Sequence, residues 1–87
     1  MIGEAVIFDF DYRGSAQVGV RLLPEYHGRG LGKRAFSLLI SVAERMGLTS
    51  LRAEVLQENL PSIALTRRFF EETGRGEGRV YFTRALV

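Results

Sequence analysis

The sequence predicts one mixed α/β domain, and three observations support that class. Two runs rich in aromatic and β-branched residues, 4–12 and 16–24, flank the turn residues 13–15 and predict an antiparallel hairpin. A run with helical periodicity follows the hairpin, and another strand-like run follows that helix. This strand–helix–strand order predicts a right-handed crossover, with the second and third strands parallel and adjacent.

The first helix is expected over 31–46, and the third strand over 48–56. The apolar residues of the helix recur at the spacings typical of one face of an amphipathic helix. They are Leu31, Ala35, Leu38, Leu39, Val42 and Met46. Gly47 follows directly, and glycine is favoured just after the C-terminus of a helix.

A second helix is expected over 58–72, with Asn59 as its N-cap and a proline in its first turn. Residues 73–79 then indicate a loop, and 80–87 a final strand. The predicted order is therefore ββαβαβ. It corresponds to a mixed sheet with a central parallel strand pair, flanked by two helices.

Composition limits the classes of function. The chain of 87 residues has no cysteine and one histidine, which excludes disulfides and thiol chemistry and argues against a metal site. Its apolar fraction of 46% fits a globular domain, and its apolar runs are too short for a membrane span or a signal peptide. A net charge of only +2 argues against a nucleic-acid partner. The resulting expectation is a cytoplasmic protein.

The segment PEYHGRGLGKRAF, residues 24–36, carries the strongest functional signal. Gly28, Gly30 and Gly32 allow several backbone N–H groups to converge on one anion at the start of the helix. The basic side chains that could add charge-assisted hydrogen bonds are Arg29, Lys33 and Arg34. So many donors favour a diphosphate over a single carboxylate.

The glycine spacing fits neither of two common phosphate motifs. A Walker A loop has four residues between its first glycine and the Gly-Lys pair, whereas three residues separate Gly28 from Gly32. The dinucleotide fingerprint G-x-G-x-x-G also fails, because the run here is G-x-G-x-G. A helix-entry loop whose glycines bind nothing is the alternative at this point.

Two segments together resemble a known family. VRLLPEYHGRGLG, residues 20–32, is similar to the coenzyme A-binding segment of the GNAT superfamily of acyltransferases. The motif of that segment is Gln or Arg, two residues, Gly, one residue, then Gly or Ala. His27, Gly30 and Gly32 occupy its positions, with His27 in place of Gln or Arg.

The segment EVLQENLPSIAL, residues 54–65, adds the second resemblance. Here Asn59 opens a helix and Ser62 follows three positions later, as in the family segment beside the pantetheine arm of coenzyme A. The residues of these two segments are most similar to those of the branch that acetylates ribosomal-protein N-termini, polyamines and antibiotics.

The resemblance implies acetyl-coenzyme A as cosubstrate, in a cleft where the second and third strands diverge. The pyrophosphate would lie on residues 27–33, and the pantetheine arm would pair with the backbone of the second strand. The implied cofactor-binding residues are Arg21, Leu22, Leu23, His27, Gly28, Arg29, Gly30, Leu31, Gly32, Lys33, Asn59 and Ser62. A primary amine would attack the thioester directly, without an acyl-enzyme.

The catalytic residues of the family carry over less directly. Members often place Glu on the second strand, where this chain has Gln17, and Tyr in the second helix, where it has Thr66. Glu54 on the third strand is the candidate substitute base, and Thr66 stands at the position of the usual proton donor. The alternative to an N-acetyltransferase is therefore a catalytically degenerate module that binds coenzyme A or a protein partner.

The resemblance covers residues 1–87 as a single GNAT-like domain, without the usual N-terminal strand and helices. A truncated gene product, a naturally minimal member and one half of a fold completed by a partner all stay open. The first strand would be an open sheet edge, which a second copy of the chain could cover by strand pairing. A homodimer is the resulting expectation, with acetyl-coenzyme A and an amine acceptor as the other partners.

Overall fold

The computed structural model describes residues 3–22 and 30–87. The elements are β1 (Gly3–Phe8), β2 (Ser15–Leu22), α1 (Leu31–Arg45), β3 (Ser50–Leu56), α2 (Leu60–Arg67), β4 (Glu71–Gly76) and β5 (Arg79–Ala85). One sheet of five strands has the order β1-β2-β3-β5-β4. The β2–β3 pair is parallel and the other pairs are antiparallel, so the predicted mixed sheet with a parallel pair and two helices is confirmed.

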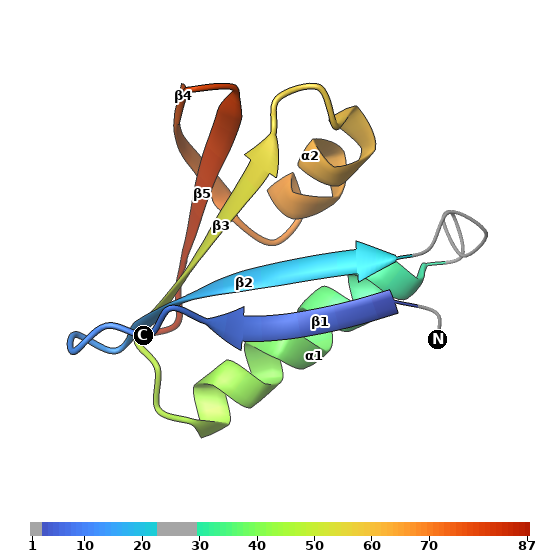
Figure 1. Ribbon diagram of the computed structural model, residues 1–87. Coiled ribbons are helices and arrows are strands. Elements are labelled where there is room, and N and C mark those ends of the chain that lie inside the picture. Colours follow the sequence, from blue (N-terminus) through green and yellow to red (C-terminus); the bar gives the residue numbers. More distant parts are fainter. Residues whose placement is uncertain (1–2, 23–29) are drawn as a thin grey trace.

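The two parallel strands pair at one end only. Their register comprises three residue pairs, Ser15–Ser50, Ala16–Leu51 and Gln17–Arg52. Beyond Gln17 and Arg52 the strands diverge, and Figure 1 shows β2 (cyan) and β3 (yellow) opening into a V. The divergence that the family resemblance implied is therefore a feature of this sheet.

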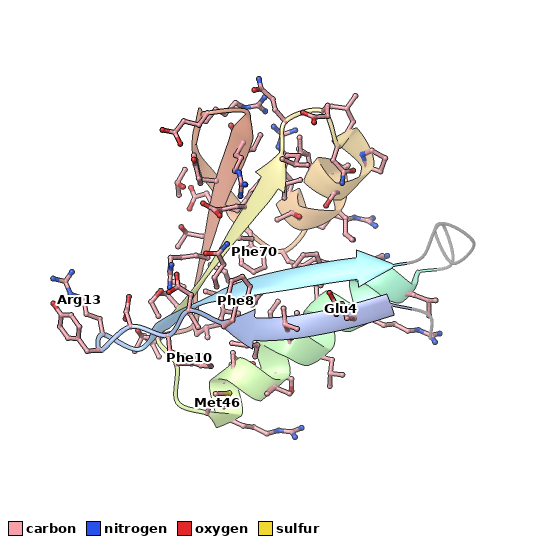
Figure 2. The ribbon with its side chains drawn as sticks, in the orientation of Figure 1. Glu4, Phe8, Phe10, Arg13, Met46 and Phe70 are labelled. Atoms are coloured by element: carbon pink, nitrogen blue, oxygen red, sulfur yellow. The ribbon has the colours of Figure 1, made fainter. Side chains whose placement is uncertain are left out.

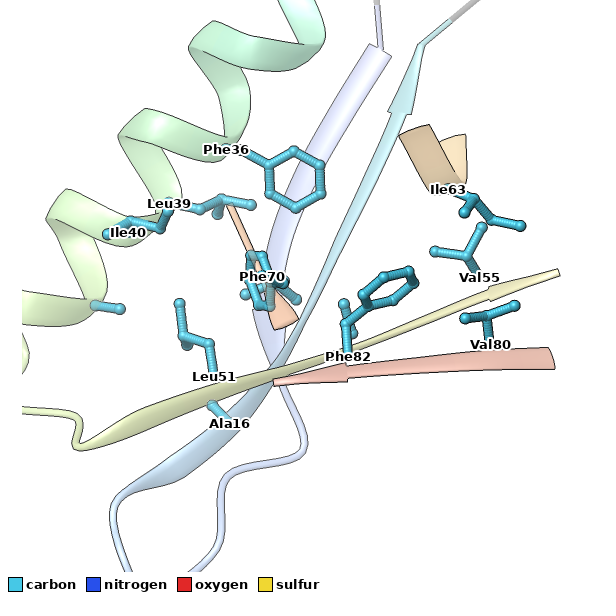
Figure 3. Packing of buried hydrophobic residues seen from close by; sticks show 13 residues of the cluster. Ala16, Phe36, Leu39, Ile40, Leu51, Val55, Ile63, Phe70, Val80 and Phe82 are labelled. Atoms are coloured by element: carbon cyan, nitrogen blue, oxygen red, sulfur yellow. The ribbon is translucent and has the colours of Figure 1, made fainter. Parts of the chain in front are cut away.

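Both helices pack on the same face of the sheet. Successive strand residues point to opposite faces, and the strand residues that face the helices are buried. They are Ala16, Val18, Leu51, Ala53, Val55, Val80 and Phe82. Figure 3 shows them meeting residues of both helices, among them Phe36 of α1 and Ile63 of α2. The alternate strand residues lie on the opposite face of the sheet, here called the outer face.

The V has two arms: β1, β2 and α1 form one, and β3, β5, β4 and α2 form the other. Aromatic rings connect these arms. The ring centroid of Phe36 on α1 lies 5.5 Å from that of Phe69 and 5.6 Å from that of Phe70, both just beyond α2. The first pair is stacked and the second is edge-to-face, which are the arrangements that aromatic rings prefer. The angle between the arms is therefore fixed by packing on the helix side.

The buried face of α1 is not the predicted one. Its buried residues are Gly32, Phe36, Leu39, Ile40 and Ala43, so Leu39 is the member shared with the predicted stripe. Leu38 and Met46 are instead 62% and 52% exposed. Two nearly equivalent apolar stripes lie one residue apart on this helix. The stripe that contains the large Phe36 side chain fills the space between the arms.

Helix α2 ends earlier than predicted, at Arg67 rather than near residue 72. The backbone N–H groups of Phe69 and Phe70 both donate to the carbonyl of Thr66, and these tight bonds close the last turn. Phe70 is then buried in the core. The chain leaves the helix here because both aromatic side chains pack against the sheet.

Residues 71–76 form the strand β4, where the sequence predicted the end of a helix and a loop. β4 pairs with β5 across Glu77 and Gly78, whose φ angles are 55° and 77°. Positive φ at both turn residues is typical of a two-residue hairpin. The order is therefore ββαβαββ rather than ββαβαβ, because the glycine-rich segment gains its regular structure from pairing with β5.

The first strand is also shorter than predicted and ends at Phe8. Asp11 Oδ1 accepts hydrogen bonds from the backbone N–H groups of Arg13 and Ser15, at 2.8 and 3.0 Å. The bond from Ser15, and then the one from Arg13, lower the pKa of Asp11. Because the Asp11 carboxylate accepts hydrogen bonds from the backbone N–H groups that follow it, this segment forms a turn instead of continuing the strand. Figure 2 shows Phe10 in this connection and Arg13 at its tip.

Neither helix in the described part of the chain is long and apolar enough to cross a membrane.

Candidate functional site

The structure describes part of the predicted cofactor loop. Outside the described residues lie Leu23, His27, Gly28 and Arg29. For Arg21 and Leu22 the structure describes only the backbone, which belongs to β2. The remaining loop residues, Gly30, Leu31, Gly32 and Lys33, form the start of α1. The role of all of them in cofactor binding stays a prediction.

The start of α1 is suited to an anion. Gly30 is the N-cap residue with φ 74° and ψ 7°, a left-handed conformation that favours glycine. As a glycine it has no side-chain acceptor for the first N–H groups of the helix, and the first turn contains no acidic residue. Lys33 and Arg34 are exposed there. The N–H groups of the first helical turn, the positive end of the helix dipole and two cations all favour a phosphate.

The helix start lies at the open end of the V. Figure 1 shows the C-terminal end of β2 and the N-terminal end of α1 on the same side of the molecule, away from the paired ends of β2 and β3. A long ligand that followed the diverging strands would therefore bring one end to this helix start and the other to the point where the strands meet.

Asn59 and Ser62 are at the start of α2, on the other arm of the V. Asn59 Oδ1 accepts a hydrogen bond from the backbone N–H of Ser62 at 3.3 Å, so the predicted N-cap is confirmed. Pro61 is in the first turn, also as predicted. The contacts of these residues with a pantetheine arm stay a prediction.

Thr66 lies inside the core. Its side chain is 1% exposed, and Oγ1 donates a hydrogen bond of 2.7 Å to the carbonyl of Ser62, one turn earlier in α2. The hydroxyl proton is therefore engaged within the helix. This geometry gives Thr66 a packing role, and we assign it no part in proton transfer.

The point where β2 and β3 separate, just after the Gln17–Arg52 pair, is here called the fork. Glu54 lies on the outer face, just beyond this fork. Gln17 Nε2 donates a hydrogen bond of 3.0 Å to Glu54 Oε2, and an Arg79 NH1 nitrogen lies 3.4 Å from the same oxygen. The Glu54 side chain is 34% exposed, so a solvent molecule or substrate can reach it. Sequence reasoning considered Gln17 and Glu54 separately and missed their contact. The parallel pairing of their strands was the available signal.

A second polar cluster locks the fork itself. Arg52 lies directly across from Gln17 in the last residue pair of β2 and β3. Its guanidinium donates to the Asp9 carbonyl at 2.7 Å and to Ser15 Oγ at 3.0 Å, and it forms an ion pair with the Asp9 carboxylate at 3.4 Å. These bonds tie β3 to both ends of the β1–β2 connection, so the strands separate at a fixed position.

A sheet that opens between two parallel strands, next to a glycine-capped helix start, defines a scaffold for a long phosphate-containing ligand. A family model described as an acetyltransferase (GNAT) domain matches residues 1–69. The chain therefore belongs to the GNAT acetyltransferase family. Among curated proteins, none matches the sequence significantly.

Solved structures with the same fold include three acetyltransferase relatives. Ribosomal-protein-alanine N-acetyltransferase from Brucella melitensis is 25% identical, with a TM-score of 0.84 over 97% of this chain and 61% of that one. A GNAT superfamily phosphinothricin acetyltransferase (Pat) from Sinorhizobium meliloti, in complex with AcCoA, is 27% identical, with a TM-score of 0.85 over 97% and 54%. The candidate acetyltransferase yncA from Salmonella typhimurium, with its cofactor acetyl-CoA, is 27% identical, with a TM-score of 0.83 over 99% and 58%. The chain thus spans between about half and three fifths of the length of these structures.

Proposed function

We propose that this chain binds acetyl-coenzyme A and transfers the acetyl group to a primary amine. The observation that carries the proposal is the start of α1 at the open end of the V, with Gly30 in a left-handed conformation and no acidic residue in the first turn. Family membership supports the same cosubstrate, and two of the similar structures contain acetyl-CoA.

The proposed contacts run along the whole length of this cosubstrate. Residues 27–33 would hold the pyrophosphate, and the β2 backbone around residues 21–23 would pair with the pantetheine arm. Asn59 and Ser62 would border the arm from the side of α2. When bound, acetyl-coenzyme A supplies an activated thioester carbonyl at the fork of the sheet.

Glu54 is the carboxylate that we propose as the general base. An amine that attacks the thioester carbon forms a C–N bond while the C–S bond breaks, and the sulfur leaves as the thiolate of coenzyme A. Glu54 takes the proton that the amine nitrogen loses and returns it through solvent to the thiolate, which gives the thiol and leaves Glu54 ionised again. General-base catalysis of this kind contributes about 10²–10⁴-fold in rate.

We place the acceptor among protein N-termini, polyamines and other small amines. Two observations support this choice of acceptor: the resemblance of the two sequence segments to that branch of the family, and the similarity to a ribosomal-protein-alanine N-acetyltransferase at 25% identity. A non-catalytic module that binds coenzyme A is the second candidate. The buried, internally bonded hydroxyl of Thr66 favours it, because the usual proton donor then has no counterpart at that position.

We further propose a homodimer through the edge strand β1. A groove of about 250 Å³ runs beside this edge, lined by Gly3, Glu4, Ala5, Leu31, Arg34, Ala35 and Leu38. Most of the lining is apolar, and Glu4 and Arg34 provide charges of opposite sign. A two-fold interface uses the same patch on both copies, so a patch with both charges can pair with itself.

Titration with acetyl-coenzyme A, followed in the amide NMR spectrum, tests the cosubstrate. We expect shifts in β2 and at the start of α1, and weaker binding in Gly30→Asp, whose carboxylate would repel the phosphates. Gly47→Asp is the matched control, because both glycines have positive φ, 74° and 80°, and no atom of the described residues lies within 4 Å of a Cβ built at either position. A folded chain whose spectrum ignores acetyl-coenzyme A, or equal binding by both variants, would contradict the proposal.

A further inference from the structure

The outer face of the sheet brings Gln17 and Glu54 together although 37 residues separate them in the chain. Neither side chain can turn to the other face, because its strand neighbours are buried in the core. Ala16 and Val18 flank Gln17, and Ala53 and Val55 flank Glu54. The register of the strands therefore sets the 3.0 Å contact between Gln17 Nε2 and Glu54 Oε2.

Two donors converge on one oxygen of Glu54. Gln17 approaches Oε2 from β2, and Arg79 approaches it from β5. The structure shows no hydrogen bond from any other described residue to the second oxygen, Oε1. A carboxylate held in this way has a fixed plane and presents one oxygen to a substrate.

The other groups around Glu54 on the outer face leave this arrangement intact. Tyr81 lies directly across from Glu54 on β5, and its hydroxyl donates to the Gly76 carbonyl at 3.4 Å. Arg52, also on the outer face, directs its guanidinium toward Asp9 and Ser15. Phe8 lies across from Gln17 on β1 and is apolar. Arg79 is therefore the charged partner of Glu54 at the fork, and Gln17 is the neutral one.

We propose that Gln17 and Arg79 are positioning residues for Glu54: they hold Oε2 so that Oε1 receives the proton of the acceptor amine. This inference rests on the proposed function. It assigns a role to a residue that cannot itself act as a base. An amide at position 17 can donate a hydrogen bond to the carboxylate, whereas a second carboxylate there could only repel it while both are ionised.

The inference makes a counterintuitive prediction for Gln17→Glu. The family often has Glu on this strand, so a simple transfer of the family pattern predicts a gain of activity. The contact with Glu54 predicts a loss instead, because two carboxylates about 3 Å apart share protons and titrate as a coupled pair. The acid limb of the pH profile of kcat/KM should then move toward neutral pH.

The test compares the wild-type chain with three variants, Gln17→Glu, Gln17→Met and Arg79→Lys, in coenzyme A thiol-release assays from pH 5 to pH 9. Spermidine and a peptide with N-terminal alanine serve as acceptors. Gln57→Glu is the matched control, since the same charge is added at an exposed position on the loop after β3. The dissociation constant of acetyl-coenzyme A is measured for each protein by calorimetry.

We expect kcat at pH 7 to fall roughly tenfold or more in Gln17→Glu and Gln17→Met, as general-base catalysis is impaired. Arg79→Lys, which keeps the charge, should lose less. Binding of acetyl-coenzyme A should be unchanged in all variants, and only Gln17→Glu should shift the acid limb. A rise or no change in kcat for Gln17→Glu would overturn the positioning role alone. A wild-type chain that binds acetyl-coenzyme A but acetylates neither acceptor would overturn the proposed transferase and this inference together.

Discussion

Phe36 provides a quantitative test of which face of α1 is buried. Its side chain is 5% exposed and makes aromatic pairs with Phe69 and Phe70. Phe36→Leu keeps most of the apolar bulk but removes both pairs, each of which contributes about 0.5–1.5 kcal/mol beyond burial. We therefore expect the free energy of unfolding to fall by about 1–3 kcal/mol. Because a domain of this size loses about 4–8 °C in Tm per kcal/mol, the change is easily measured.

Met46→Ala is the control on the same helix. The sequence pattern placed Met46 in the buried stripe, but the side chain is 52% exposed at the C-terminal end of α1 (Figure 2). Exposed substitutions usually change stability by about 0.5 kcal/mol or less. Urea unfolding of both variants, followed by circular dichroism, compares the two stripes. Equal losses, or a larger loss for Met46→Ala, would refute the buried face described above.

Two further predictions concern Glu72 and the edge strand. Hydrogen bonds from Arg75 and then Arg67 lower the pKa of Glu72 to about 2. The resulting stabilisation is complete above the unfolded pKa of about 4.5 and is lost as the pH falls toward 2. In urea unfolding between pH 5 and pH 2, Glu72→Gln should therefore lose less stability than the wild-type chain, and parallel curves would count against this ion pair. Leu38→Lys, in the groove beside β1, should convert the proposed dimer into a monomer in sedimentation analysis, and a wild-type chain that sediments as a monomer would contradict the dimer.

Local chemistry explains which elements the sequence could predict. The Asn59 cap and Pro61 mark the start of α2 from adjacent residues alone. The hairpin and the crossover follow from the order of the strand-like and helix-like segments along the chain. β4 depends instead on pairing with β5, since Gly74 and Gly76 contribute little strand propensity of their own. The buried stripe of α1 is decided by the partner surface: periodicity predicted one apolar face, and the face one residue further along the chain is the one that packs against the sheet.

The same division applies to the candidate site. The glycine-rich helix start is a local signal, because backbone freedom and helix N–H groups come from adjacent residues. The pair formed by Gln17 and Glu54 is non-local and depends on where two strands stop pairing. Sequence reasoning could recognise that the usual glutamate was missing. It could not show that the glutamine in its place contacts another carboxylate.

The position of the fork connects the fold to the proposed chemistry. If β2 and β3 had stayed paired for two more residues, the Glu54 side chain would lie over a continuous sheet. The bonds of Arg52 to Asp9 and Ser15 hold the last pair together, and the strands separate immediately afterwards. Glu54 is thus the first outer-face residue of β3 beyond the fork, at the place where a thioester between the strands would end. Arg52 therefore fixes where the strands open, while Gln17 and Arg79 fix how the carboxylate is presented.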